Sequence, residues 1–249
     1  MTSFRRRDVL KGTALVLAGG TVARAGVIAG RLPWQPGASA APPGNAGNTD
    51  THAWKFFTAS EAAVVEAICD RFIPPDPQTP GGKDAGCAVF IDRQLSGPYG
   101  KHAGLYDAPP FEKGGKQQGP QSAMGPADLY RKGLAALEEH VRNDRHASGF
   151  TMLEGAQQDE VLQALERGQV QFSGGLDAQT FFEQMLKDAQ EGFFADPLYG
   201  GNRDMAAWKM IGFPGARYDY RDWVGRHNER YPLPPVSIAG RAEWTPGTG

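Results

Sequence analysis

The chain has 249 residues, and its 26 Lys and Arg residues against 28 Asp and Glu residues give a formal net charge of −2. This balance provides no basic excess of the kind that indicates binding to nucleic acid or to an anionic membrane surface. Glycine (33 residues) and proline (19 residues) are abundant, which predicts long connections between regular elements.

Residues 1–40 have the order of a twin-arginine export signal. Arg6 and Arg7 are followed by a spacer, two apolar residues and a lysine, as is typical of such signals. The run 12–30 is only mildly apolar and contains an arginine, whereas a membrane-spanning helix needs about 20 mostly apolar residues. Residues 38–40 have the small-x-small form of a cleavage site. We therefore expect a removable signal and a periplasmic mature protein.

The twin-arginine route carries proteins that are already folded, so it suits a chain that joins a partner or takes up a cofactor in the cytoplasm. Removal of residues 1–40 leaves 20 basic and 27 acidic residues, a net charge near −7. The remaining 209 residues suit one domain, with or without a long tail.

Residues 41–55 are rich in Pro, Gly, Ala and Asn and are predicted to be a flexible linker. A helical domain is expected over 56–215. Its first helix begins at the capping box TASE, residues 58–61, and ends before two prolines, 74–75. A shorter helix is expected from about residue 84 to residue 95.

Further helices are predicted over 126–146, 157–167, 177–194 and 205–211, because apolar residues recur there at helical spacing. The loop 97–125 has no periodicity and is long for a passive connector. No stretch alternates as a strand does. The sequence therefore predicts an all-α fold of five or six helices with long ordered loops and Pro- and Gly-rich tails. The last part, 216–249, is predicted to be an extended C-terminal tail.

The two cysteines, Cys69 and Cys87, both lie in the mature part of the chain. In an oxidising compartment such a pair is a candidate disulfide. The alternative is that both are small buried apolar side chains. Two cysteines without a matched histidine pair are too few for a zinc or iron–sulfur site of the usual kind.

The sequence lacks the common motifs of redox and hydrolytic enzymes. It contains no G-x-G-x-x-G, no C-x-x-C-H, no G-x-S-x-G, no H-E-x-x-H and no P-loop. A cofactor bound by this chain is therefore not expected.

The segment 196–215 is the one stretch dense enough in polar and aromatic groups to suggest an active site. Its two adjacent glycines could approach a phosphate, although Gly-Gly-Asn is also an ordinary tight turn. The alternative to an active site is a loop that stabilises the fold or docks on another protein. The residues singled out are Asp196, Tyr199, Gly200, Gly201, Asn202, Arg203, Trp208 and Phe213.

Three segments resemble a known family. They are 57–97 (FTASEAAVVEAICDRFIPPDPQTPGGKDAGCAVFIDRQLSG), 128–134 (DLYRKGL) and 181–215 (FFEQMLKDAQEGFFADPLYGGNRDMAAWKMIGFPG). In this order they resemble the gluconate 2-dehydrogenase subunit 3 family, the small subunit of membrane-bound flavin-dependent sugar and sugar-acid dehydrogenases.

The resemblance implies a complex of three subunits. A large subunit carries FAD and oxidises the substrate, and a multi-haem cytochrome c subunit passes electrons to quinone in the membrane. The small subunit supplies the export signal read by the twin-arginine translocase and is needed for maturation of the flavoprotein. It has no catalytic residues that could be transferred to this sequence, and it is held at the membrane through its partners.

On this interpretation the segment 196–215 is structural and partner-docking. Asp196 and Arg203 are expected to hydrogen-bond to backbone groups and to each other, while Trp208 and Phe213 fill the core or a groove of the partner. Two alternatives remain. One is a free-standing periplasmic enzyme that uses the loop from Asp196 to Arg203, and the other is a periplasmic scaffold or binding protein.

Overall fold

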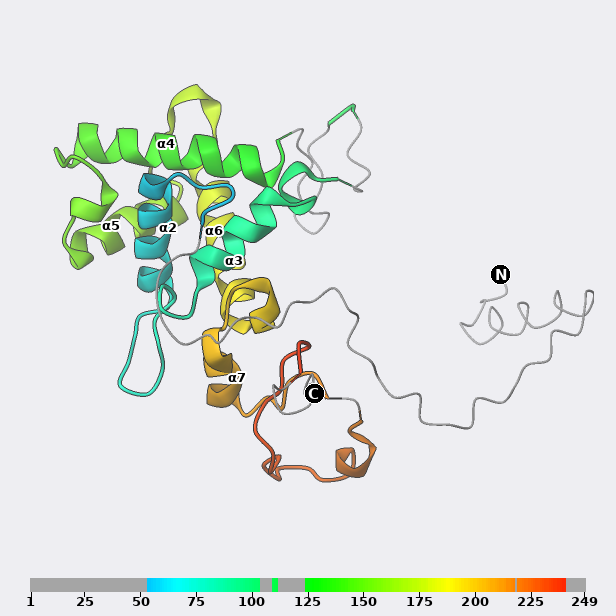
Figure 1. Ribbon diagram of the computed structural model, residues 1–249. Coiled ribbons are helices and arrows are strands. Elements are labelled where there is room, and N and C mark those ends of the chain that lie inside the picture. Colours follow the sequence, from blue (N-terminus) through cyan, green and yellow to red (C-terminus); the bar gives the residue numbers. More distant parts are fainter. Residues whose placement is uncertain (1–52, 104–108, 112–123, 218, 241–249) are drawn as a thin grey trace, which may run out of the picture. The chain divides into compact units, whose positions relative to one another are not determined.

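The computed structural model describes residues 53–103, 109–111, 124–217 and 219–240 (Figure 1). These residues contain six α-helices, α2 to α7, joined by loops and short 3-10 turns, and no strand beyond isolated bridges. The predicted all-α class is confirmed. The predicted export signal, with Arg6 and Arg7, lies outside the described residues. None of the described helices is long and apolar enough to cross a membrane.

Helix α2 (Ala59–Phe72) begins at the predicted capping box. The Thr58 hydroxyl accepts from the backbone N–H of Glu61, and the Glu61 carboxylate accepts from the backbone N–H of Thr58 at 2.8 Å. This reciprocal pair satisfies two N–H groups that a helix start otherwise leaves without partners. The apolar face of α2, including Val65 and Ile68, is buried in the core.

Helix α3 (Cys87–Ser96) begins three residues later than predicted. Gly86 has φ +82°, a left-handed conformation that cannot continue an α-helix backward. The residues before it form tight turns, in which the Gly82 N–H donates to the Ile73 carbonyl at 2.8 Å and the Cys87 N–H donates to the Gly82 carbonyl at 3.0 Å. These turns bring α3 back against α2.

Helix α4 (Pro126–Asp144) has its proline in the first turn, as predicted, but ends before His146. His146 has φ +53°, which terminates a right-handed helix. Helix α5 (Gly155–Glu166) starts two residues before the predicted position.

Helix α6 (Ala178–Phe194) is the element against which the others pack, with α3, α5, α2 and α4 all in contact with it. Its N-cap Asp177 accepts from the Thr180 N–H at 3.1 Å. The α4–α6 contact is close because Gly133 has no side chain: a Cβ there would lie 2.2 Å from Cδ2 of Phe181. Phe181 also meets the fully buried Tyr130 edge to face, with ring centroids 6.1 Å apart.

Two buried carboxylates connect distant parts of the chain. Asp92 on α3 accepts the backbone N–H groups of residues 55, 56 and 57, each at 2.9 Å, and so fixes the segment that leads into α2. Asp188 on α6 accepts from the hydroxyls of Tyr99 and Tyr130 at 3.0 Å and from the Gln184 amide at 2.8 Å.

Helix α7 (Ala206–Ile211), orange in Figure 1, packs against the end of α6. The residues after Gly215, which the sequence predicts to be a tail, come back to this part of the fold. Gly215 forms an isolated bridge with Val236, which is buried, and the Ala216 N–H donates to the Val236 carbonyl at 2.6 Å. The C-terminal residues therefore contact the segment that the sequence singles out.

Candidate functional site

Asp196 lies directly after α6, and its carboxylate is fully engaged by the chain itself. It accepts from the Leu198 N–H at 2.9 Å, from the Ser237 hydroxyl at 2.7 Å and from the Ile238 N–H at 2.7 Å. The expected pairing of Asp196 with Arg203 is therefore wrong. The Arg203 side chain is exposed, and only its backbone takes part, donating to the Ala85 carbonyl at 3.0 Å.

Asn202 is completely buried and joins α6 to α7. Its side-chain Nδ2 donates to the Ala195 carbonyl at 2.9 Å, and its Oδ1 accepts from the Ala207 N–H at 2.9 Å. Its φ of +45° is a conformation that asparagine tolerates better than most residues. Because both ends of the amide are bonded to the backbone, it fixes a turn and has no group directed at a ligand.

Gly200 and Gly201 lie where the backbone of their own turn approaches the backbone of α6 and the backbone before α3. Gly200 has φ +106°, and a Cβ on Gly201 would lie 2.0 Å from the carbonyl oxygen of Gly192 on α6. On the other side, a Cβ on Gly86 would lie 2.6 Å from the Gly200 carbonyl oxygen. The predicted turn is confirmed at Gly200, and the close approach is to other backbone. Sequence reasoning missed Gly86 and Gly192, because no local pattern reveals a contact between such distant residues.

The aromatic residues of the segment divide into one buried and two exposed groups. Trp208 is 6% exposed, and its indole N–H donates to the Phe194 carbonyl at 2.8 Å. Phe213 meets Trp208 edge to face at a centroid distance of 5.1 Å but remains 44% exposed. Tyr199 is 46% exposed. Trp208 therefore belongs to the fold, whereas Phe213 and Tyr199 present apolar surface to the outside.

Exposed apolar side chains are concentrated in the whole C-terminal part of the described chain. Among the described residues, nine of the eleven strongly exposed large apolar side chains lie between residues 194 and 238. Such a concentration is typical of an interaction surface, since soluble monomers rarely gather exposed apolar groups in one region. The nine are Phe194, Leu198, Tyr199, Met210, Ile211, Phe213, Val224, Leu233 and Ile238.

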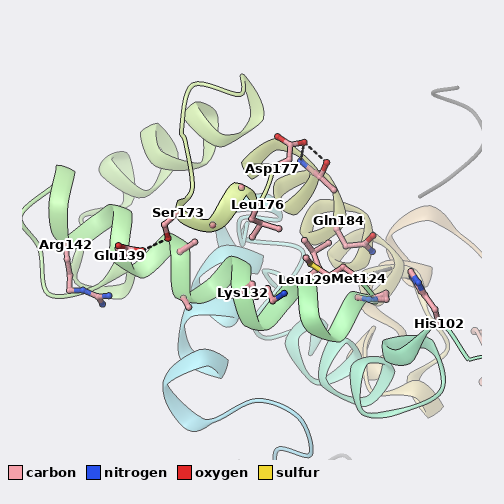
Figure 2. Close-up of a pocket in the computed structure, with 16 residues that line it drawn as sticks. His102, Met124, Leu129, Lys132, Glu139, Arg142, Ser173, Leu176, Asp177 and Gln184 are labelled. Carbon is pink, nitrogen blue, oxygen red and sulfur yellow. Dashed lines mark hydrogen bonds between the residues drawn. The ribbon is translucent and has the colours of Figure 1, made fainter. Parts of the chain in front are cut away.

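A second candidate is the cleft between α4 and the stretch 173–177, with a volume of about 980 Å³ (Figure 2). Several of its polar groups are hydrogen-bonded within the fold: the Ser173 hydroxyl donates to Glu139 at 2.7 Å, and the Gln184 amide donates to Asp188, which lies outside the lining. Ser173 with Glu139 and Thr180 with Asp177 are hydroxyl–carboxylate pairs among the lining residues, and Asp177 is also the N-cap of α6. Neither carboxylate has a further side-chain partner within the described residues that would orient it as a catalytic base.

Next to this cleft, burial raises the pKa of Asp188 above its ordinary value, although three hydrogen bonds to the carboxylate act in the opposite direction. Burial and the negative charge of Asp188 also raise the pKa of Tyr99 and of Tyr130. Shifted pKa values occur in active sites and also in structural networks. The Asp188 side chain is only 3% exposed, so this network is structural.

Cys69 and Cys87 are both buried, one near the end of α2 and one at the start of α3, and the structure holds them as thiols. Hydrogen bonding to Cys87, together with burial, raises the pKa of the Cys69 thiol well above its usual value. The side chains are therefore adjacent, as a disulfide would require. The bond itself stays a prediction. Within the described ranges, no group of three or more His, Cys, Asp or Glu side chains could hold a metal ion.

Comparison with protein families gives one match, to the family described as gluconate 2-dehydrogenase subunit 3, over residues 59–215. The match begins with α2 and ends at the glycine that pairs with Val236. No curated protein and no solved structure matches the chain. The matched range is more than half of the chain, and the protein therefore belongs to the gluconate 2-dehydrogenase subunit 3 family.

Proposed function

We propose that this chain is the non-catalytic small subunit of a membrane-bound, FAD-dependent complex of the gluconate 2-dehydrogenase type. Its partners are a large flavoprotein subunit, which holds FAD, and a multi-haem cytochrome c subunit. The chain acts in export, maturation and stabilisation of the flavoprotein. The complex works in the periplasm and is held at the membrane through the partner subunits.

This proposal is supported by the side chains of the segment 196–215, in which the buried polar groups are bonded within the chain and apolar groups are exposed. Its two buried polar side chains, Asp196 and Asn202, are bonded to the chain's own backbone and to Ser237. Its outward face carries several exposed apolar side chains, including Tyr199 and Phe213, which are close to half exposed. An active site directs polar groups toward a substrate, whereas this arrangement leaves apolar surface for a partner.

The export role rests on the predicted signal in residues 1–40. A twin-arginine signal delivers folded cargo, so a small subunit that already holds the flavoprotein can carry both chains across with one signal. This explains why an accessory subunit would need an export signal of its own.

Export is tested by replacing Arg6 and Arg7 with lysine in cells that make the whole complex. We expect both this chain and the flavoprotein to remain in the cytoplasm when cells are fractionated. Arg24→Lys, outside the arginine pair, is the matched control and should leave export unchanged. If the flavoprotein still reached the periplasm with the double variant, the escort role would be wrong.

The non-catalytic role is tested on the isolated mature chain. We expect neither flavin nor haem absorbance and no dye-linked oxidation of gluconate. In the assembled complex, Tyr199→Phe should change turnover per flavin by less than a few fold. Turnover by the isolated chain, or an assembled but inactive Tyr199→Phe complex, would support the enzymatic alternative instead.

A further inference from the structure

The charges of the chain are distributed unequally. Residues 53–196 contain 13 basic and 21 acidic residues, whereas residues 197–240 contain six basic and four acidic ones. The mature protein is acidic overall, but the part that carries most of the exposed apolar side chains has a small positive excess. A partner for this part would therefore be expected to offer negative charge.

Two of the six basic residues of this part line a cleft of about 460 Å³, here named the C-terminal cleft. Trp208 and Phe213 line it on the α7 side, and the proline-rich run 232–235 lines it on the side of the returning chain. Lys209 and Arg230 are the two cationic side chains among its lining residues.

Unlike Arg221 and Arg226, the two cations have no acidic partner within the described residues. Arg221 pairs with Asp219 at 2.5 Å, and Arg226 lies 3.8 Å from Glu229. Lys209 and Arg230 form no such ion pair in the part of the chain that the structure describes, and both are exposed. Their charge is therefore available to a carboxylate from outside.

The apolar lining is preorganised. Trp208 is fixed by its bond to the Phe194 carbonyl and by its contact with Phe213, and prolines have little conformational freedom to lose. Met210 and Ile211, 49% and 58% exposed, extend the apolar surface along the outer side of α7. A rigid aromatic and proline surface binds a partner at low entropic cost.

From these observations we propose that the C-terminal cleft binds an acidic segment of the flavoprotein subunit. Carboxylates of that segment pair with Lys209 and Arg230, while an apolar side chain packs against Trp208, Phe213 and the proline run. This inference rests on the proposed role as a small subunit and adds the surface and the chemistry of its contact with the partner.

Two other occupants fit less well. An anionic membrane surface attracts a cluster of one sign, and here four acidic residues are interspersed among the basic ones: Asp204, Asp219, Asp222 and Glu229. A second copy could offer its acidic helical region, but because that contact joins two different surfaces, a symmetric dimer would have to form it twice at once.

The test is a double charge reversal, Lys209→Glu with Arg230→Glu, in the full-length chain made together with its complex. The chain, tagged at its C-terminus, is recovered from detergent-extracted membranes, and flavin per chain is measured. We expect at least about a tenfold loss of flavin, the scale of one close charge pair between proteins. The control Lys132→Glu with Arg167→Glu makes the same charge change on exposed residues of α4 and the end of α5, and it should retain flavin.

Thermal unfolding by circular dichroism shows whether each variant still folds. If the charge-reversal variant is unfolded, the variant Lys209→Gln with Arg230→Gln replaces it, and we expect the same loss of flavin per chain. The conservative pair Lys209→Arg with Arg230→Lys should retain the flavoprotein, and high salt should release it from the wild type.

The outcomes separate this inference from the proposed function. A folded reversal that keeps its full flavin overturns the cleft assignment but leaves the small-subunit role intact. A wild-type chain that recovers no flavoprotein overturns the small-subunit role. If the isolated chain sedimented with phosphatidylserine vesicles and the reversal did not, the occupant would be the membrane instead. If light scattering showed a dimer that the reversal abolished, the occupant would be a second copy.

Discussion

The carboxylate of Asp196 accepts a hydrogen bond from the backbone N–H of Ile238 at 2.7 Å, across 42 positions of sequence. The Ser237 hydroxyl donates to the same side chain at 2.7 Å. One buried acidic residue after α6 thus holds the returning C-terminal residues, which line the C-terminal cleft through the run 232–235. Together with the bridge between Gly215 and Val236, this attachment holds the returning chain beside the segment 196–215.

Asp196→Ala should therefore release the C-terminal residues while the helices remain folded. It removes the acceptor of the Leu198 and Ile238 N–H groups, and because both bonds are only partly buried each loss should cost about 1 kcal/mol. Hydrogen exchange should become faster around Val236 and Ile238. Asp204→Asn, at an exposed position of the same segment with φ +57°, is the control, because asparagine tolerates that conformation, and equal exchange in both variants would contradict the attachment.

The helices could be predicted because their signals are local. The capping box at Thr58 and Glu61 spans four residues, and the Asp177 cap lies three residues from the N–H that it accepts. The bond from Asp196 to Ile238 could not be predicted, since no periodicity or motif connects residues so far apart. The expected Asp196–Arg203 pair was wrong for this reason: the nearest opposite charge in sequence is not the nearest donor in space.

Trp208→Ala should be among the most destabilising changes in the segment. Trp208 is 6% exposed, and deleting a buried aromatic side chain typically costs about 3–5 kcal/mol. Phe213→Ala should cost much less, because Phe213 is 44% exposed, yet it should weaken recovery of the flavoprotein. Urea unfolding measures the first effect and flavin per chain the second. Equal destabilisation by both changes would show that Phe213 is a core residue.

Valine at Gly200 or Gly201 should prevent normal accumulation of the protein, for two different reasons. Gly200 has φ +106°, which strains a β-branched residue, and a Cβ on Gly201 would lie 2.0 Å from the Gly192 carbonyl oxygen. Gly212→Ala is the control: it has φ +72° with no atom within 4 Å and should cost only about 1–2 kcal/mol. Folded yield distinguishes them, and a normal yield of Gly201→Val would refute the close backbone contact.

The candidate site could be predicted only in part. The residue types of Gly200 and Asn202 favour a turn, whereas the sequence leaves open whether Trp208 fills the core or a groove of the partner. Lys209 and Arg230 could not be identified, since the cleft forms only when the run 232–235 returns beside α7. A site made by two distant segments leaves no motif in either one.

Cys69 and Cys87 should be found as a disulfide in protein recovered from the periplasm. The two thiols are adjacent and buried, and a bond would close a loop of about 18 residues, worth on the order of 3 kcal/mol by loop entropy. Thiol labelling of denatured, unreduced protein should find no free cysteine. Protein kept in the cytoplasm by the Arg6 and Arg7 replacements is the control and should label at both residues. Two labelled thiols in the periplasmic protein would show that the pair stays reduced.

Two carboxylates, those of Asp188 and Asp159, should act in opposite directions on the pH dependence of stability. Burial raises the pKa of Asp188 above its ordinary value of 3.8. Its contribution to stability is therefore complete below pH 3.8 and is lost as pH rises through the raised pKa of the folded state. Hydrogen bonding to Arg71, at 2.6 Å, lowers the pKa of Asp159. Its contribution is present above pH 3.8 and is lost as pH falls through the lowered pKa.

Urea unfolding across the range from pH 3 to pH 8 separates the two groups. Relative to wild type, Asp188→Asn should become progressively less unfavourable as pH rises above about 3.9, by no more than about 1.4 kcal/mol per pH unit. Asp159→Asn should instead become less unfavourable as pH falls below that value, and by a smaller amount, because the Arg71–Asp159 pair is about one-third exposed and solvent weakens it. The same direction for both variants would contradict this assignment, since burial dominates the pKa of Asp188 whereas the bond to Arg71 dominates that of Asp159.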